Sequence, residues 1–188
     1  RSDIVILMEA IAMIFIGGIH GVGKSFFCDK VKSELSIFTY SSSELIAKRK
    51  KVYFSSDKLI PDIDDNQRHL LSAINALNSI GKQYLLDGHF CLLNAEGQVT
   101  RIPEGTFYNL HPDAIILLTE KPEVIAERRM QRDRINYKLD EIGKFQDEEI
   151  AYATEVANIL GIPIWISLGS NDQNKALDFI RVNFGEAE

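Results

Sequence analysis

Hydrophobic residues near the start of the chain follow two different spacings. The apolar run from Met13 to Ile16 contains no polar residue, so we interpret Ala12–Gly17 as a strand that is buried on both faces, as in a parallel sheet. After Lys24, apolar residues recur at helical spacing, namely at Phe27, Val31 and Leu35. A buried strand followed directly by a helix is typical of the first half of a βαβ unit.

The same alternation continues along the chain. Further strands are predicted at Ser36–Tyr40, Gln83–Asp87, Ala114–Leu118 and Pro163–Leu168. Helices are predicted at Glu44–Lys51, along the apolar stripe Leu70 to Ile80, from Pro122 onward, at Glu141–Leu160 and at Lys175–Phe184. A polar connection is expected at Asp57–Asp65 and a turn at Asn94–Gly97. This order predicts a three-layer α/β/α domain with a five-stranded parallel sheet and right-handed crossovers.

Length and composition favour one globular domain. The chain has 188 residues, of which 45% are hydrophobic and 26% charged, which is enough to bury a core. We expect this domain at residues 13–188, because Met13 would be a natural start just before the first strand. Residues 1–12 are expected to be an extension or a remnant of protein expression. The apolar run from Ile4 is too short to span a bilayer and contains Glu9, so no membrane partner is expected.

The net charge disfavours a nucleic acid partner, and the two cysteines disfavour a metal site or a disulfide framework. The chain has 21 basic and 27 acidic residues, a net charge of −6, so it has no overall positive field for a nucleic acid. The basic residues Lys48–Lys51 are interpreted as a solvated helix end. Cys28 and Cys91 lack the spacing of a metal site or a disulfide framework, which favours a reducing, cytoplasmic environment.

Residues 18–25 read GIHGVGKS, the pattern of a phosphate-binding P-loop. Its glycines let backbone N–H groups converge on phosphate oxygens, and the following helix directs the positive end of its dipole at the same anion. We predict that Lys24 reaches the β and γ phosphates of ATP and that Ser25 ligates Mg²⁺. The predicted ATP-binding residues are Gly18, Gly21, Val22, Gly23, Lys24, Ser25 and Phe26.

A second group of polar residues follows the predicted strand Gln83–Asp87. Asp87 ends this strand, where its carboxylate could reach the Mg²⁺ across from Ser25; the alternative is an ordinary helix or turn cap. His89 comes two residues later. It is a candidate for the acceptor pocket or for the water shell of the magnesium ion, and the alternative is a structural or surface histidine.

An arginine-rich segment follows Pro122. Arg128 and Arg132 are four residues apart and share one face of the predicted helix. Two guanidinium groups so placed could clamp a phosphoryl group during transfer, because each donates paired hydrogen bonds and neutralises spreading negative charge. The alternative is a solvated helix face with ion pairs to Glu127 and Asp133.

These segments together resemble the archaeal-type and nuclear-type adenylate kinases of the nucleoside monophosphate kinase superfamily. The resemblance is carried, in order, by the P-loop, Ser42-Ser43-Glu44-Leu45, Asp87-Gly88-His89 and Glu127–Arg132, and it covers about Met13 to Leu168. The sequence departs from the family pattern at His20, where proline is usual, at Phe26, where a small hydroxyl residue is common, and at Glu44, where aspartate is usual.

The resemblance implies a two-substrate kinase. ATP would lie on the P-loop, and the acceptor would bind between the two walls that carry Ser42, Ser43 and Glu44 on one side and Asp87 and His89 on the other. Arg128 and Arg132, from a short lid, would close over the phosphates, and Lys24 and Asp87 would complete the catalytic group. The acceptor would be a small molecule, specifically a nucleoside monophosphate.

Two other functions remain open from the sequence. One is a P-loop kinase that acts on another small metabolite. The other is an ATP-binding or ATPase switch module that acts on a partner protein.

Overall fold

The computed structural model of the chain describes residues 13–51 and 59–185. The expected N-terminal extension, residues 1–12, lies outside the described residues, and so does the beginning of the predicted polar connection at residues 57–58.

Five parallel strands form the main sheet, in the order β2-β4-β1-β7-β8. This confirms the predicted α/β architecture. The strands are β1 (Met13–Gly17), β2 (Phe38–Ser41), β4 (Tyr84–Asp87), β7 (Ala114–Thr119) and β8 (Ile164–Leu168). Every residue of β1 is buried, as its unbroken apolar run predicts for a central strand with helices on both faces.

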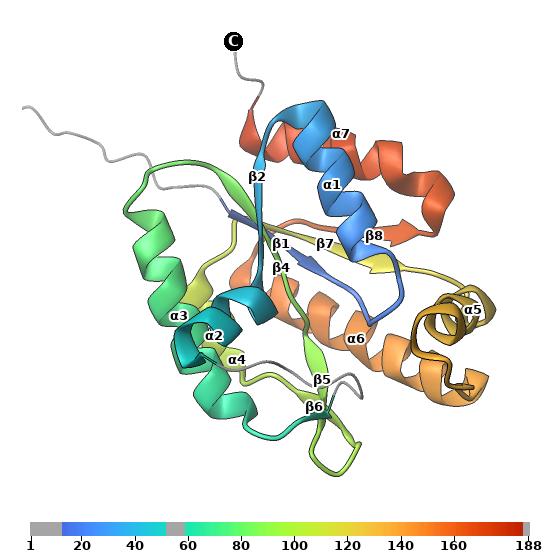
Figure 1. Cartoon of the computed structure of the whole chain (residues 1–188). Helices are drawn as coiled ribbons and strands as arrows, with labels where there is room; N and C mark the ends of the chain where they lie inside the picture. The colour runs from blue at the N-terminus through green and yellow to red at the C-terminus, as the bar shows by residue number, and fades with distance from the viewer. Residues whose placement is uncertain (1–12, 52–58, 186–188) are drawn as a thin grey trace, which may run out of the picture.

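Helices cover both faces of this sheet (Figure 1). On one side lie α1 (Lys24–Leu35) and α7 (Gln173–Phe184), and on the other lie α4 (Glu104–Leu110) and α6 (Leu139–Leu160). The remaining helical segments are α2 (Ser42–Lys50), α3 (Ile63–Asn78), α5 (Pro122–Asp133) and the short 3-10 turn η1 (Ser170–Asp172). The arginine-rich segment that resembles a lid is the last part of α5.

A second, smaller sheet was not predicted. It contains β3 (Leu59–Ile60), β5 (Cys91–Asn94) and β6 (Val99–Arg101), in the order β3-β5-β6. The predicted turn at Asn94–Gly97 joins β5 to β6, and Gly97 takes a positive φ of 77° there. Strands of two to four residues are too short for a periodic pattern to reveal them.

The start of β2 also differs from the prediction. Ser36 does not belong to the strand: it takes the left-handed conformation, with φ 54°, and ends α1. The strand begins at Phe38 and runs to Ser41, whose side chain then caps α2 by accepting a hydrogen bond from the N–H of Glu44. The carboxyl end of β2 therefore leads straight into α2, with no loop between them.

A cluster of aromatic rings lies behind the carboxyl ends of the central strands. The Phe15 ring centroid is 5.0 Å from that of Phe90 and 5.5 Å from that of Phe107, with rings edge to face, and Phe90 stacks on Phe107 at 4.8 Å. Tyr152 of α6 packs against the same group. Such ring pairs resist rearrangement, so they give the site in front of them a rigid floor.

None of the helices within residues 13–51 and 59–185 combines the length and the apolar character that a membrane crossing requires.

Candidate active site

A pocket of about 650 Å³ opens at the carboxyl ends of β1, β2 and β4. Parallel pairing brings these ends together, because Asp87 lies opposite Ile16 of β1 and also opposite Ser41 of β2. The carboxyl edge of an open parallel sheet is where such folds bind ligands. The pocket is continuous from the P-loop to a second wall built by α2, α3, α4 and the small sheet.

The P-loop has the conformation that its glycines require. Gly18, Gly21 and Gly23 all have positive φ, at 139°, 89° and 101°, which favours glycine over residues with a side chain. A Cβ at Gly18 would also lie 2.8 Å from the carbonyl oxygen of Leu118. Gly23 is the N-cap of α1, so the helix begins at Lys24 with its positive dipole end directed into the loop.

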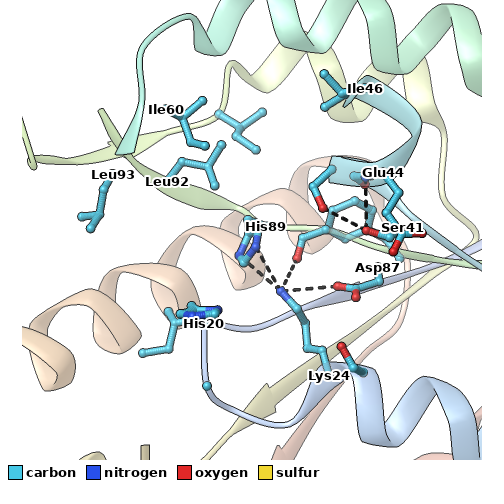
Figure 2. A pocket seen from close by; sticks show the side chains of 18 of the residues that line it. His20, Lys24, Ser41, Glu44, Ile46, Ile60, Asp87, His89, Leu92 and Leu93 are labelled. Atoms are coloured by element: carbon cyan, nitrogen blue, oxygen red, sulfur yellow. Dashed lines mark hydrogen bonds and ion pairs between the residues drawn. The ribbon is translucent and has the colours of Figure 1, made fainter. Parts of the chain in front are cut away.

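Lys24 connects the P-loop to the loop after β4. Its Nζ donates to the carbonyl oxygens of Gly18, at 2.7 Å, and Gly88, at 2.9 Å. Asp87 Oδ1 is 3.4 Å away, and both ring nitrogens of His89 lie within 3.3 Å (Figure 2). The ammonium group is therefore held at the junction of two loops, at the edge of the pocket.

The residues predicted for magnesium offer suitable ligand chemistry. Ser25 and Asp87 both line the pocket and supply a hydroxyl and a carboxylate, the oxygen ligands that Mg²⁺ prefers. In the described part of the chain no group of three or more His, Cys, Asp or Glu side chains could hold a metal ion. A magnesium ion at Ser25 and Asp87 would take its other ligands from water and phosphate oxygens, as is usual for this ion.

Three arginines of α5 lie against the P-loop, and each has a different role in the packing. Arg128 Nη1 donates to the carbonyl oxygen of Val22 at 3.1 Å. Arg132 contacts the ring of His20 and forms an ion pair with Asp133 at 2.7 Å. Arg129 is only 6% exposed and its Nε donates to the carbonyl oxygen of His20 at 2.7 Å. Burial lowers the pKa of the Arg129 guanidinium.

Glu149 of α6 connects two loops of the pocket through buried hydrogen bonds. It is 1% exposed, and its two carboxylate oxygens accept backbone N–H bonds from Gly18 at 3.1 Å, Phe90 at 3.0 Å and Cys91 at 2.7 Å. Burial raises the pKa of this carboxyl, and the three hydrogen bonds and the charge of Lys24 act in the opposite direction. One side chain thus fixes the start of the P-loop relative to the loop that carries His89.

The wall opposite the P-loop is mostly apolar, and we call it the distal wall. It consists of Ser42, Ser43, Glu44, Ile46, Ile60, Asn66, Gln67, Leu70, Leu92, Leu93, Thr106, Phe107 and Leu110. Figure 2 shows Ile60, Leu92 and Leu93 together on one side of this wall and Glu44 with Ser41 on another. Several of its side chains are almost fully buried, including Leu70, Phe107 and Leu110, so the wall is enclosed by the fold.

Most of the residues predicted for the site line this one pocket. They are Gly21, Gly23, Lys24, Ser25, Phe26, Ser42, Ser43, Glu44, Asp87, His89, Arg128 and Arg132. Gly18 and Val22 do not line it and act through their backbones, since their carbonyl oxygens accept hydrogen bonds from Lys24 and Arg128.

Arg129, Glu149, Asn66 and Gln67 also belong to the site or support it, and they were not predicted from the sequence. Two of these residues, Glu149 and Arg129, could have been recognised from their positions in the helical pattern. Glu149 occupies an apolar position of α6, in line with Phe145 and Tyr152, where a carboxylate is unexpected unless it has buried partners. Arg129 follows Ile125 by four residues and so lies on the buried face of α5, whereas only the face with Arg128 and Arg132 was considered.

Comparison with known proteins gives a family and a fold. A family model described as an AAA domain matches residues 17–144, which include the P-loop, the distal wall and α5. None of the curated proteins matches the sequence.

Solved structures with the same fold include several kinases. A shikimate kinase from Acinetobacter baumannii, in complex with shikimate, is 14% identical with a TM-score of 0.55, over 93% of this chain and 94% of that one. A gluconokinase from Sinorhizobium meliloti is 13% identical with a TM-score of 0.53, over 93% and 95%. A sugar kinase from Janibacter is 12% identical with a TM-score of 0.53, over 93% and 94%. These likenesses show a P-loop kinase-like fold.

Proposed function

The chain belongs to this AAA domain family, and from that premise we propose that it is a magnesium-dependent kinase that transfers the γ-phosphoryl group of ATP to a small molecule. The observation that carries the proposal is the position of Lys24, which connects the P-loop to the loop after β4 and lines a continuous pocket that extends to the distal wall. A site for hydrolysis alone needs no such second wall, whereas a transfer reaction needs a place for the acceptor.

The proposed chemistry is alignment and electrostatic stabilisation. The backbone of the P-loop and the start of α1 would hold the phosphates, and Lys24 would neutralise charge on the transferred group. Ser25 and Asp87 would hold Mg²⁺, which supplies further charge neutralisation when bound. Arg132 lines the pocket beside the P-loop, where it could approach the γ phosphate. No covalent intermediate is required, because the acceptor attacks phosphorus directly.

A small acceptor suits the distal wall better than a protein substrate does. The wall is built from side chains of five separate elements and most of its apolar residues, such as Leu70 and Phe107, are buried, so it fits a small molecule better than the surface of a folded partner. A nucleoside monophosphate, as the adenylate kinase resemblance implies, and a hydroxyl-bearing metabolite are the two acceptor classes within this proposal. A regulatory ATPase would instead hydrolyse ATP without regard to small acceptors.

The test is ADP formation from Mg-ATP with and without a panel of nucleotides, nucleosides, sugars and small alcohols. At least one acceptor should raise ADP formation well above the rate with Mg-ATP alone. Lys24→Ala should abolish the acceptor-dependent rate, because it removes charge from the transition state. Lys30→Ala, on the same helix but outside the pocket, is the matched control and should keep it. Wild-type turnover in Lys24→Ala would refute the proposal.

A further inference from the structure

We propose that the acceptor is an uncharged hydroxyl compound with an apolar body, not an anion such as a phosphate ester or a carboxylate. The inference rests on the proposed kinase function and names the substrate class of the distal wall. It follows from three properties of the pocket: where its cations lie, which charges already balance them, and which polar atoms of the distal wall have no hydrogen-bond partner.

The basic residues that line the pocket all lie away from the distal wall. They belong to the P-loop, to the loop after β4 and to α5, and they are His20, Lys24, His89, Arg128, Arg129 and Arg132. Within residues 13–51 and 59–185, the distal wall contains no lysine, arginine or histidine. An anionic group on the acceptor that faced this wall would lose its hydration without a cation to replace it.

Two described basic residues at the end of α2, next to the distal wall, already have partners. In α2, Lys50 Nζ lies 2.8 Å from Asn66 Oδ1 and 3.1 Å from Asp65, and Arg49 donates to the carbonyl oxygen of Ser72. None of Lys48, Arg49 and Lys50 lines the pocket. The basic end of α2 therefore fastens α2 to α3 and contributes no charge to an acceptor.

Three of the cations near the P-loop pair with carboxylates, whereas Arg129, on the same side of the pocket, has no ion pair with a described carboxylate and its buried Nη2 has no hydrogen-bond partner among the described residues. Lys24 pairs with Asp87 at 3.4 Å. Arg132 pairs with Asp133 at 2.7 Å. Arg128 lies 3.8 Å from Glu120. A bound triphosphate would compete for these same cations, which leaves little positive charge for a second anion beside it.

The distal wall contains one acidic residue, Glu44, and this residue also disfavours an anionic acceptor. Glu44 is exposed, lies in the first turn of α2 and has no ion pair with any described residue. Figure 2 shows it with Ser41 on the side of the pocket where Asp87 lies. A negative acceptor group would be repelled by this carboxylate, whereas a hydroxyl group could donate a hydrogen bond to it.

Two buried polar atoms point to the kind of group that the wall binds. Ser42 Oγ and Gln67 Oε1 have no hydrogen-bond partner among the described residues. Both residues are buried: Ser42 is only 8% exposed and Gln67 only 5%. Buried polar atoms without partners are costly, so a ligand that supplies a hydroxyl or amide group would stabilise them. The side chains around them are apolar, including Ile46 and Leu70, which suits the ring or hydrocarbon part of the acceptor.

Phosphoryl transfer to such an acceptor forms one bond to phosphorus and breaks another. The acceptor hydroxyl oxygen forms a bond to the γ phosphorus, and the bond between that phosphorus and the β–γ bridging oxygen breaks, with its electron pair leaving on ADP. The hydroxyl proton passes to the carboxylate of Glu44 and from there to water, because Glu44 is exposed.

Matched acceptor pairs test the inference. Each nucleoside is compared with its 5′-monophosphate, and each cyclic alcohol with the hydroxy acid of the same ring, by kcat/KM for ADP formation. We expect the uncharged member of the best pair to be preferred at least tenfold. A monophosphate or acid that is used as well as its uncharged partner, or better, overturns the inference and leaves the kinase proposal standing. If no acceptor of either charge raises ADP formation, the kinase proposal itself fails, and the inference fails with it.

A charge-neutral variant isolates the contribution of Glu44. Glu44→Gln should lower kcat for hydroxyl acceptors, because glutamine cannot accept the proton, and it should reduce the preference for the uncharged member about tenfold, because it removes the repulsion and keeps the size of the side chain. Glu141→Gln is the matched control, since Glu141 is also an exposed glutamate in the first turn of a helix but lies outside the pocket. An unchanged preference in Glu44→Gln would contradict the assigned role of this carboxylate.

Discussion

The carboxylate of Glu149 accepts a hydrogen bond from the backbone N–H of Gly18 at 3.1 Å, although 131 positions separate the two residues in the sequence. The same carboxylate accepts from Phe90 and Cys91. Gly18 begins the P-loop, and Phe90 follows His89, so α6 sets the distance between the two loops that hold Lys24. The ammonium group of Lys24 depends on that distance for its contacts with both.

Removing the Glu149 side chain should therefore destabilise the fold and the nucleotide site together. Glu149→Ala leaves three backbone N–H groups without acceptors, each worth about 1–3 kcal/mol, and opens a cavity as well. We expect a loss of about 3 kcal/mol or more in the free energy of unfolding, measured by urea denaturation, and a higher KM for ATP. Glu148→Ala, at an exposed neighbouring position, should change stability by about 1 kcal/mol or less.

The ionisation of Glu149 predicts a pH dependence. Burial raises the pKa of this carboxyl above its ordinary value of 4.5 in the folded protein, so the folded state binds its proton more tightly than the unfolded state. Its contribution to stability is then full below pH 4.5 and is lost as pH rises through the folded pKa. Glutamine does not titrate. The stability of the wild type minus that of Glu149→Gln should fall with rising pH across this window; a difference that is constant or grows would contradict the prediction.

Sequence patterns were sufficient for the main sheet because its central strands are uniformly apolar and its phosphate loop has a fixed glycine spacing. Met13–Gly17 and Ala114–Leu118 could be recognised as strands for that reason. The small sheet was not recognised, since β3 has only two residues and β6 three, and their pairing is set by contacts distant in sequence.

The site was predicted where chemistry follows a local motif and missed where it depends on packing. Lys24 and Asp87 follow buried strands, so their approach could be expected from parallel pairing. Glu149 comes from a helix more than a hundred positions away from the P-loop, and no local pattern links the two. A glutamine near a helix start is normally a surface residue, so the burial of Gln67 follows from packing that no local pattern reveals.

Gly88 is a position where even one methyl group should disturb the pocket. A Cβ there would lie 2.7 Å from Cζ of Phe15 and 2.8 Å from Oγ of Ser42. Gly88→Ala should cost about 1–3 kcal/mol of stability, as overpacking does. Gly105→Ala is the matched comparison: it lies in α4 with no atom within 4 Å of its Cβ position, so it should stabilise the protein by about 0.5–1 kcal/mol. Thermal unfolding of both variants measures the change in melting temperature, which should be negative for Gly88→Ala and positive for Gly105→Ala. Equal changes in the two variants would contradict the contact geometry.

Arg128 and Arg132 of α5 should have separable kinetic effects. Arg128 donates to the backbone of the P-loop, so Arg128→Ala should raise the KM for ATP and lower kcat. Arg132 makes no hydrogen bond to a P-loop carbonyl in the described structure and contacts the His20 side chain, so Arg132→Ala should lower kcat about tenfold or more with a smaller change in KM. Steady-state kinetics at saturating acceptor provides the comparison. The same change of kcat and KM in both variants would argue against separate roles.

The strands of the main sheet all run the same way, so every loop at its amino edge is remote from the pocket. Gly81 and Lys82, between α3 and β4, are exposed, and no atom lies within 4 Å of the Cβ position of Gly81. Exposed loop tips of this kind tolerate inserted sequence. A fluorescent reporter or an affinity tag placed there would leave the mouth of the pocket uncovered, and the molecule could be immobilised on a surface with its site facing the solution.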